Sequence, residues 1–390
     1  MIRRIQVKNF KSFRDVTIDL SVNNVLVGPN MAGKSNFIEF FRFVKDLIFP
    51  SQPGLYGLNS ALNPRGGFGQ VVWKGDENPF IEFALEGDAP WQGGKADWRY
   101  TVRILGNFQW GSAQIDQEKL VFTDGSGAHV LIDTADQQKR LFGADGRQLS
   151  AFPDASRLGL EYEFPGWEAS ALKQSILSWK FYNLIPPLMR QPNPTAASES
   201  LNIHGDNLSA WLMLLQTRFF ESFERIRNAA CDVFPSLDSI FTNPTSQSTV
   251  FLSSKEKFLK RPSTIAEMSD GELAFLSLLS LIYAPVEKGA DIYFLEELEN
   301  HLHPRLLSVL MGLLRQVQAE YPEGGAQVVL TTHSPHLVDN FTIDELLIAK
   351  KINGATELTR PATKKELLDF ITNTELGLGE LYYSGALTGA

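Results

Sequence analysis

The stretch that decides the fold of this 390-residue chain spans residues 28–35 and runs Gly28-Pro29-Asn30-Met31-Ala32-Gly33-Lys34-Ser35. It fits the pattern G-x-x-x-x-G-K-[ST]. A short apolar run, Asn24 to Val27, precedes it, and an aromatic-rich segment of helix length, Asn36 to Phe49, follows it. Glycines in this pattern let backbone N–H groups surround phosphate oxygens, and the positive end of the next helix attracts the anion. A chance Gly-rich turn is the alternative, but a strand before the match and a helix after it are the context that phosphate binding needs.

The match assigns a role to its polar residues. Lys34 is expected to meet the β and γ phosphates, and the Ser35 hydroxyl is expected to bind Mg²⁺. We therefore predict an ATP and Mg²⁺ site whose nucleotide-binding residues are Asn30, Gly33, Lys34, Ser35 and Asn36.

Composition limits the class of protein. With 36 basic and 45 acidic residues the net charge is −9, and 43% of the residues are apolar, as in ordinary globular proteins. The single cysteine, Cys231, argues against a disulfide scaffold and a multi-cysteine zinc site, so a cytoplasmic protein is expected. The most apolar segment, Leu273 to Val286, is shorter than the roughly 20 residues that span a bilayer, so no membrane segment is expected.

Apolar patterning predicts an α/β chain. Period-two alternation predicts early strands and a β-rich region, and continuous apolar runs predict buried parallel strands later in the chain. The amphipathic stretch Leu208 to Val233 predicts one long helix. The expected strands are Ile2–Asn9, Val16–Leu20, Asn24–Val27, Asp291–Leu295 and Gln327–Thr331, the β-rich region is 70–165, and loops are expected at 50–69 and from 234 to Ser269.

A pair of carboxylates follows the apolar run that ends at Leu295. Glu296 is expected to hold the Mg²⁺ shell through water, and Glu297 to polarise the attacking water, as phosphoryl transfer requires. An exposed Glu pair that begins a helix is the alternative.

Two further motifs can reach a nucleotide. Ser269 and Gly271, in Met268-Ser269-Asp270-Gly271-Glu272, can form a second anion site at a helix N-terminus, or Ser269 can simply cap that helix with Glu272 completing the box. His333, at the end of a predicted strand, can reach a γ-phosphate or be satisfied locally. His301 and His303 do not share a helix face, so a zinc pair is not favoured.

The order of these motifs, with the opening IRRIQVKNFKSFRDVTIDL and the segments GPNMAGKSN, MSDGELAFL and LTTHSPHLVD, resembles ABC-type ATPases. The opening is similar to SMC and RecF-like proteins, and the whole resembles the AAA family ATPases of the OLD group, common in bacterial anti-phage defence systems. The resemblance implies an ABC-type P-loop ATPase head with a β-rich lobe and a helical insertion. Its expected parts are 1–85 with 262–390 for the head, 86–165 for the lobe and 166–261 for the helices.

The resemblance also implies a mechanism and partners. ATP would be clamped between Lys34 and Ser35 of one copy and Ser269 and Gly271 of another, so a homodimer or higher oligomer is expected. Lys34, Glu297 and His333 would serve ATP hydrolysis, and Ser35, Glu296 and Gln70 would hold the metal, with Gln191 a second candidate for the glutamine. Glu296 stands where the family usually has Asp, so turnover is expected to be slow.

The last part of the chain bears on whether this protein is itself a nuclease or acts through a separate effector protein. The resemblance to the OLD group implies comparison with its nucleases, which carry a C-terminal Toprim domain that cuts DNA with metal ions. The 57 residues after His333, with a helix candidate at 364–372, are too few for a domain of typical size. A separate, Toprim-like nuclease effector is therefore expected. A RecF-like or SMC-like DNA-repair ATPase and a nucleotide-binding scaffold with negligible hydrolysis are the alternatives. Arg3-Arg4 and Lys255 to Arg261 are the candidate basic spots for DNA, although the net charge counts against it.

Overall fold

The computed structural model describes residues 1–50, 57–74, 80–107, 112–135, 138–196, 198–321, 325–361, 369, 371, 373 and 376–387. The chain folds as two compact units. Unit 1 comprises Met1–Trp179, Ile343–Leu376 and Ser384–Ala390, and unit 2 comprises Lys180–Thr342 and Gly377–Tyr383. The three-part division expected from the sequence stays a prediction, and its first boundary, after residue 85, falls inside a strand. The helix expected at 364–372 lies largely outside the described residues.

Unit 1 contains an antiparallel sheet with the strand order β2-β1-β4-β5-β6-β7-β8-β9 in its described part. The expected early strands and the β-rich region are confirmed. Apolar side chains of β1, such as Ile5 and Val7, are fully buried, as their alternation predicts. The strands are β1 (Ile2–Phe10), β2 (Phe13–Asp19), β4 (Phe80–Trp91), β5 (Gly94–Gly106), β6 (Ala113–Asp124), β7 (Gly127–Ala135), β8 (Gln138–Phe142) and β9 (Gln148–Phe152).

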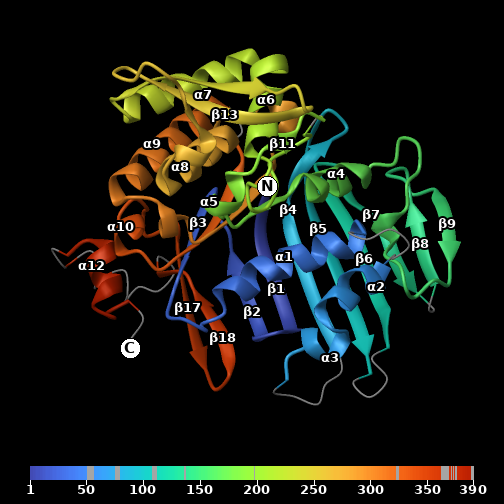
Figure 1. The fold of residues 1–390 in the computed structure, drawn as a ribbon. Coiled ribbons are helices and arrows are strands. Elements are labelled where there is room, and N and C mark those ends of the chain that lie inside the picture. Colours follow the sequence, from blue (N-terminus) through green and yellow to red (C-terminus); the bar gives the residue numbers. More distant parts are fainter. Residues whose placement is uncertain are drawn as a thin grey trace. The chain divides into compact units, whose positions relative to one another are not determined.

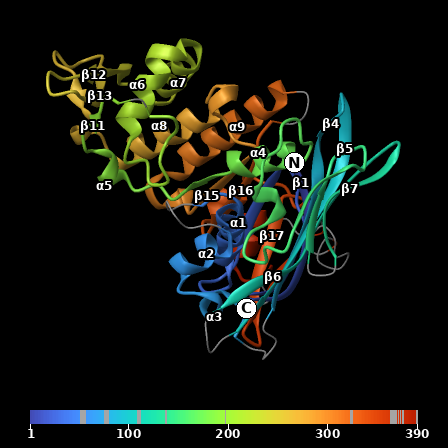
Figure 2. The ribbon, with the colours of Figure 1, turned by 90° about the vertical axis from the view of Figure 1, so that its right-hand side faces the viewer.

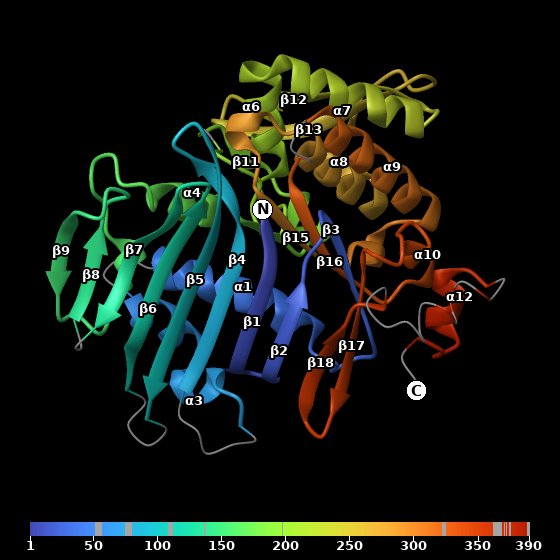
Figure 3. The same cartoon turned by 180° about the vertical axis from the view of Figure 1, so that it is seen from behind.

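Helices of unit 1 cover one face of this sheet, and Figure 3 shows its other face. Helix α1 (Lys34–Ile48) packs on the strands through aromatic rings, since Phe40 lies 5.6 Å from both Phe10 and Phe83 between ring centroids. The loop expected at 50–69 is wrong from residue 57 onward, because α2 (Gly57–Leu62) and a short 3₁₀ turn, Asn63–Arg65, form there, and α3 (Phe68–Val71) follows. Tertiary burial of Leu58, Ala61 and Leu62 overrides their weak local pattern.

A second group of strands in unit 1 carries the phosphate-loop motif. Strand β3 (Asn23–Val27) is buried along its whole length and pairs in parallel with β17 (Leu346–Ile352). Strand β18 (Ala355–Thr359) then pairs antiparallel with β17. Unit 1 also contains a 3₁₀ turn, Gly159–Glu161, and helix α4 (Ser170–Ser178). Burial of both faces explains why Asn24–Val27 is apolar without alternation.

Unit 2 has a parallel group of strands, β10-β15-β16, with helices beside it. Strand β15 (Ile292–Glu296) pairs with both β10 (Lys180–Tyr182) and β16 (Gln327–Thr332). The two apolar runs expected as buried parallel strands are confirmed. The helices of this group are α5 (Pro186–Met189), α8 (Asp270–Ile282), α9 (Pro304–Glu320), α10 (Pro335–Val338) and α12 (Leu378–Tyr383).

The helical part of unit 2 differs from the sequence expectation in two ways. The single helix at 208–233 is wrong, because Phe219 (φ −128°, ψ 57°) separates α6 (Leu208–Arg218) from α7 (Phe220–Val233). Most residues of α6 are buried, whereas α7 buries only one face, so the break lets each helix bury a different surface. The loop expected before Ser269 instead holds β12 (Leu237–Pro244), β13 (Thr249–Glu256) and β14 (Ser263–Thr264), and β13 also pairs with β11 (Asn193–Pro194) (Figure 2).

None of the described helices combines the length and the apolar character that crossing a membrane requires.

Candidate functional site

The phosphate-loop motif of unit 1 joins β3 to α1, and two of its glycines are required by close packing. A Cβ atom on Gly28 would lie 2.3 Å from the carbonyl oxygen of Ala349. Gly33 has a φ of +103°, and a Cβ there would lie 2.2 Å from Oγ1 of Thr356. Strands β17 and β18 therefore leave room for backbone alone at both positions.

Helix α1 begins at Lys34, and its N-cap residue, Gly33, has no side chain that could cap the helix. Lys34, Ser35 and Asn36 form the first turn, whose N–H groups have no acceptor within a helix. The helix dipole adds positive potential at this end. Met31 sits at the loop's tip with a φ of 67° and a side chain that is 82% exposed. The residues assigned to phosphate and Mg²⁺ thus share one helix N-terminus, where the helix dipole favours an anion.

The Lys34 side chain is buried and already directed at the loop. Its Nζ donates hydrogen bonds to the carbonyl oxygens of Gly28, at 2.8 Å, and Pro29, at 3.2 Å. Only 6% of Lys34 is exposed, so these acceptors compensate a cation that has lost most of its water. The ammonium group is therefore held inside the loop by two of its carbonyl oxygens.

A chain of hydrogen bonds fastens the loop to two other segments of unit 1. Nδ2 of Asn36 donates to Oγ of Ser12 at 2.7 Å, and a 2.7 Å hydrogen bond joins the hydroxyls of Ser12 and Thr356. The Thr356 hydroxyl also donates to the carbonyl oxygen of Ala32 at 2.8 Å. Asn36 thus supports the loop through Ser12. No sequence motif points to Ser12 or Thr356, and the two residues lie 344 positions apart in the chain.

Gln70 is exposed at the end of α3. Its Oε1 accepts a 2.7 Å hydrogen bond from Nζ of Lys74, four residues further along the chain. This contact gives its assignment to Mg²⁺ no support. Gln191, the other candidate, is an exposed residue of unit 2 just before β11.

The acidic pair lies at the end of β15 in unit 2. Glu296 is half-buried as the last residue of the strand, and Glu297 is exposed and left-handed, with φ 49° and ψ 52°. This conformation is unusual for a residue other than glycine and clusters at functional sites. The backbone N–H of Glu297 donates to the carbonyl oxygen of Thr331 at 3.1 Å. Only a short 3₁₀ turn, Leu298–His301, follows, so the pair does not begin an α-helix.

The structure brings Glu297 and His333 together. Nε2 of His333 lies 4.0 Å from Oε1 of Glu297, and Nδ2 of Asn300 donates to Oε2 of Glu297 at 2.9 Å. Parallel pairing of β15 with β16 produces this meeting, because both strands end at the same edge. Asn300 was not among the expected site residues, although it lies only three residues after Glu297.

Ser269 caps helix α8 in the way that the alternative interpretation expects. Its Oγ accepts from the N–H of Glu272 at 3.2 Å, and Oε2 of Glu272 accepts from the Ser269 N–H at 2.7 Å. A Cβ on Gly271 would lie 3.2 Å from the carbonyl oxygen of His301. Arg190, which sequence analysis missed, donates to the carbonyl oxygen of Met268 at 2.8 Å. Ser269 itself is exposed, so the cap does not exclude a contact with a ligand.

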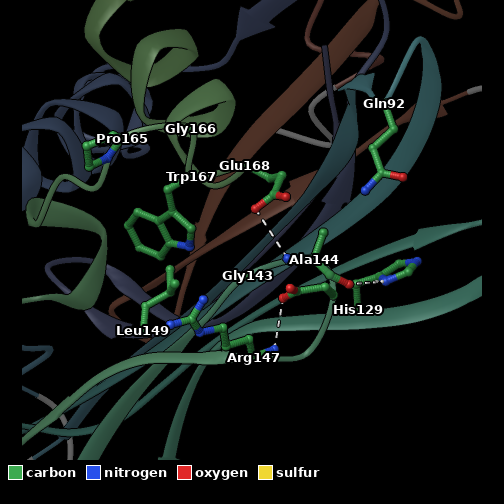
Figure 4. Close-up of a pocket in the computed structure, with 11 residues that line it drawn as sticks. Gln92, His129, Gly143, Ala144, Arg147, Leu149, Pro165, Gly166, Trp167 and Glu168 are labelled. Carbon is green, nitrogen blue, oxygen red and sulfur yellow. Dashed lines mark hydrogen bonds between the residues drawn. The ribbon is translucent and has the colours of Figure 1, made fainter.

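A separate pocket of about 500 Å³ lies in the β-rich part of unit 1 (Figure 4). His129 Nδ1 donates to the carbonyl oxygen of Ala144 at 3.0 Å, and Glu168 accepts from the N–H of Ala144 at 3.2 Å. These polar groups hold the loop that forms the pocket wall. The residues expected from the sequence to bind ATP or Mg²⁺ do not line it; its lining residues are Gln92, His129, Gly143, Ala144, Asp145, Arg147, Leu149, Pro165, Gly166, Trp167 and Glu168.

Within the described ranges, no three His, Cys, Asp or Glu side chains are grouped to hold a metal ion by themselves. The expected Mg²⁺ donors do not require such a group, since Mg²⁺ keeps several waters and substrate phosphates among its ligands.

Comparison with known proteins supports the fold. Residues 1–81 match the family model of an AAA ATPase domain, and residues 214–339 match that of an AAA domain described as a putative AbiEii toxin of a type IV TA system. No curated protein matches the chain in sequence.

Solved structures of SMC heads share the fold at low sequence identity. An SMC head bound to the C-winged helix domain of ScpA has a TM-score of 0.56 and 16% identity over 92% of this chain and 97% of that one. An SMC head with an extended coiled coil, bound to the C-terminal domain of ScpA derived from Pyrococcus furiosus, has a TM-score of 0.54 and 14% identity over 95% and 99%. The chain therefore has the fold of an ABC-type AAA ATPase head.

Proposed function

We propose that this chain is an ABC-type ATPase that binds ATP with Mg²⁺, pairs with a second copy around the nucleotide and hydrolyses it slowly to ADP and phosphate. The observation that carries the proposal is the phosphate loop of unit 1. There, two sterically required glycines, an uncapped helix N-terminus and the buried ammonium group of Lys34 come together. This combination has the geometry and the charge to bind a polyphosphate.

Binding rests on the first turn of α1. Lys34 would exchange its carbonyl acceptors, Gly28 and Pro29, for phosphate oxygens, which are stronger acceptors for an ammonium group. The Ser35 hydroxyl would be a ligand of Mg²⁺. When bound, Mg²⁺ supplies charge neutralisation on the phosphates. The backbone of Asn30 and Gly33 would surround the phosphate oxygens.

Hydrolysis rests on the residues at the ends of β15 and β16. Glu297 would accept the proton of the attacking water, and His333 would donate a hydrogen bond toward the γ-phosphate. Their 4.0 Å separation supports this shared role. Glu296 would hold a water of the metal shell. Since Glu296 is one methylene longer than the family's usual Asp, we expect slow turnover.

Pairing would complete the site. Ser269 and Gly271 of one copy would face the nucleotide held by Lys34 and Ser35 of the other. The exposure of Ser269 at an α-helix N-terminus supports this role. To bind an anion, its hydroxyl would exchange the Glu272 carboxylate, to which it donates at 2.7 Å, for a phosphate oxygen. ATP would then stabilise the dimer, and hydrolysis would release it.

We further propose that the ATPase is a cytoplasmic sensor or scaffold that controls a separate effector, a Toprim-like nuclease, in anti-phage defence. The resemblance to OLD-group ATPases supports this role. The description of the matched model, a putative toxin of a toxin–antitoxin system, is in keeping with it.

One observation favours the DNA-repair alternative. The turn between β13 and β14 exposes Phe258 to 88% and Leu259 to 49%, next to Lys260 and Arg261. Cations beside an exposed aromatic side chain suit a nucleic acid. The alternative of a nucleotide-binding scaffold with negligible hydrolysis is supported by Glu296, which stands where the family usually has Asp.

Measuring ATP hydrolysis and molecular mass with and without DNA tests these functions. Slow hydrolysis that DNA does not change, with dimers in ATP, supports the proposal. Strong stimulation by DNA favours repair, and binding without hydrolysis favours the scaffold. If the purified chain cleaves plasmid DNA, and mutation of its own acidic residues abolishes this cleavage, the proposal of a separate nuclease is contradicted.

A further inference from the structure

Glu299 joins the acidic turn after β15 to the end of β16. Its Oε1 accepts a 2.7 Å hydrogen bond from the Thr332 hydroxyl and a 2.6 Å hydrogen bond from the backbone N–H of His333. The Thr332 oxygen in turn accepts from the N–H of Ser334 at 2.9 Å. One carboxylate oxygen therefore fixes the backbone on which the His333 side chain is mounted.

The same turn also carries Glu297. Its backbone N–H is bound to Thr331, and the Nε2 atom of His333 lies 4.0 Å from its carboxylate. Glu297 and Glu299, two positions apart in the same turn, thus both bind the end of β16. If the Glu299 contacts were lost, the His333 backbone could shift while Glu297 stayed in place.

Stability alone does not explain this residue. Oε2 of Glu299 is buried and accepts no hydrogen bond within the described part of the chain. Burying a carboxylate oxygen without a donor costs free energy. A buried polar group of this kind calls for another reason, and the two short contacts of Oε1 to the His333 segment supply one.

We propose that Glu299 is a positioning residue that sets the His333 imidazole against Glu297, with Thr332 as its second contact. This inference rests on the proposed ATPase function. In this proposal, the length of the Glu299 side chain affects the rate of hydrolysis. Its negative charge does not act on the nucleotide directly.

Two substitutions separate reach from charge. Glu299→Asp keeps the charge but shortens the side chain by one methylene, so it cannot hold both donors. Glu299→Gln keeps the reach and a carbonyl acceptor but loses the charge. Thr332→Val removes one of the two contacts. Glu287→Ala, at an exposed residue of unit 2, is the matched control.

The first measurement does not depend on hydrolysis. In ¹⁵N-histidine-labelled protein, the His333 amide signal, assigned with a His333→Gln variant, should lie downfield because of its short bond to a carboxylate. It should move upfield by a large step in Glu299→Asp and remain near its place in Glu287→Ala. An unmoved signal would overturn the proposed contact, whether or not the protein hydrolyses ATP.

The second measurement is the rate. We expect kcat to fall about 10- to 100-fold in Glu299→Asp with KM unchanged, since a misplaced catalytic group has effects of this order. Glu299→Gln should retain a rate within a few-fold of wild type, and Thr332→Val should lie between them. The reverse order, an inactive Gln variant and an active Asp variant, would overturn the positioning role in favour of a charge at the reaction centre.

A lower melting temperature with unchanged kcat would show that Glu299 is merely structural and would also overturn the proposal. No hydrolysis in wild type would refute the ATPase function, and the amide signal would still decide whether the contact exists.

Discussion

The hydroxyl of Thr356 donates a 2.8 Å hydrogen bond to the carbonyl oxygen of Ala32, which lies 324 positions earlier in the chain. Thr356 belongs to β18, and Ala32 lies inside the phosphate loop. The same hydroxyl is joined to Ser12, so three distant segments of unit 1 meet at the loop. A turn and a strand that carry no nucleotide motif of their own therefore support the loop's conformation.

Replacing Thr356 by Val should loosen the loop without removing any proposed ATP contact. Val keeps the shape but leaves the Ala32 carbonyl without its donor, which typically costs about 1 kcal/mol. We expect a several-fold loss of ATP affinity by calorimetry. Thr359→Val, on the same strand, is the control, and an equal effect of both variants would show general damage to β18.

Lys34→Ala should reduce ATP affinity by at least about tenfold, since hydrogen bonds to charged groups contribute about 1.5–3 kcal/mol. The measurement is titration of ATP with Mg²⁺ present. Lys119→Ala, at an exposed lysine of β6, should bind like wild type. Unchanged affinity in Lys34→Ala would refute the phosphate-loop assignment.

Glu297→Gln should bind ATP normally and lose hydrolysis by about 10²- to 10⁴-fold, because a general base is removed while the geometry persists. Single-turnover hydrolysis and ATP affinity should be measured together. Glu296→Gln is the comparison variant. If Glu296→Gln loses turnover and Glu297→Gln does not, the roles of the two carboxylates are exchanged.

Ser269→Arg should block ATP-dependent pairing while each copy still folds, because Ser269 is exposed and the bulky cation would occupy the partner's phosphate site. Loss of the helix cap costs about 1 kcal/mol in this variant. Ser269→Ala loses the same cap without the bulk and is the control. Equal ATP-dependent mass in Ser269→Arg and wild type would show that Ser269 is only a cap.

Lys180 predicts a pH effect on stability. Burial, together with Lys288, lowers the pKa of Lys180 to about 8 in the folded protein, below its ordinary value of 10.5. Between these pH values the unfolded chain holds the proton and the folded one does not, so this contribution to stability rises with pH.

Lys180→Met should therefore stabilise the protein at pH 7, by on the order of 2 kcal/mol, and much less at pH 10. Chemical denaturation at both pH values measures the difference. Lys351→Met, at an exposed lysine, should show no such pH dependence. A constant difference between Lys180→Met and wild type across this range would contradict the lowered pKa.

The sequence predicted the elements of the fold that a single local pattern specifies. The strands Asn23–Val27 and Gln327–Thr332 are buried along their whole length, as their apolar centres predict, and the glycine pattern between a strand and a helix marks the phosphate loop. The sequence prediction was wrong where tertiary packing overrides the local pattern. The stretch 208–233 is helical in composition throughout, yet Phe219 breaks it, because the two halves bury different surfaces.

The candidate site shows the same division. The sequence by itself determined that residues 28–35 form a phosphate-loop turn and that carboxylates and a histidine follow buried strands, because backbone chemistry and periodicity are local properties. Only the tertiary structure decided that Thr356 and Ser12 fasten the loop, that Glu297 faces His333, and that Glu299 holds the His333 backbone. These contacts depend on strand pairing between distant segments, and pairing energy is spread over whole strands rather than encoded in any one residue.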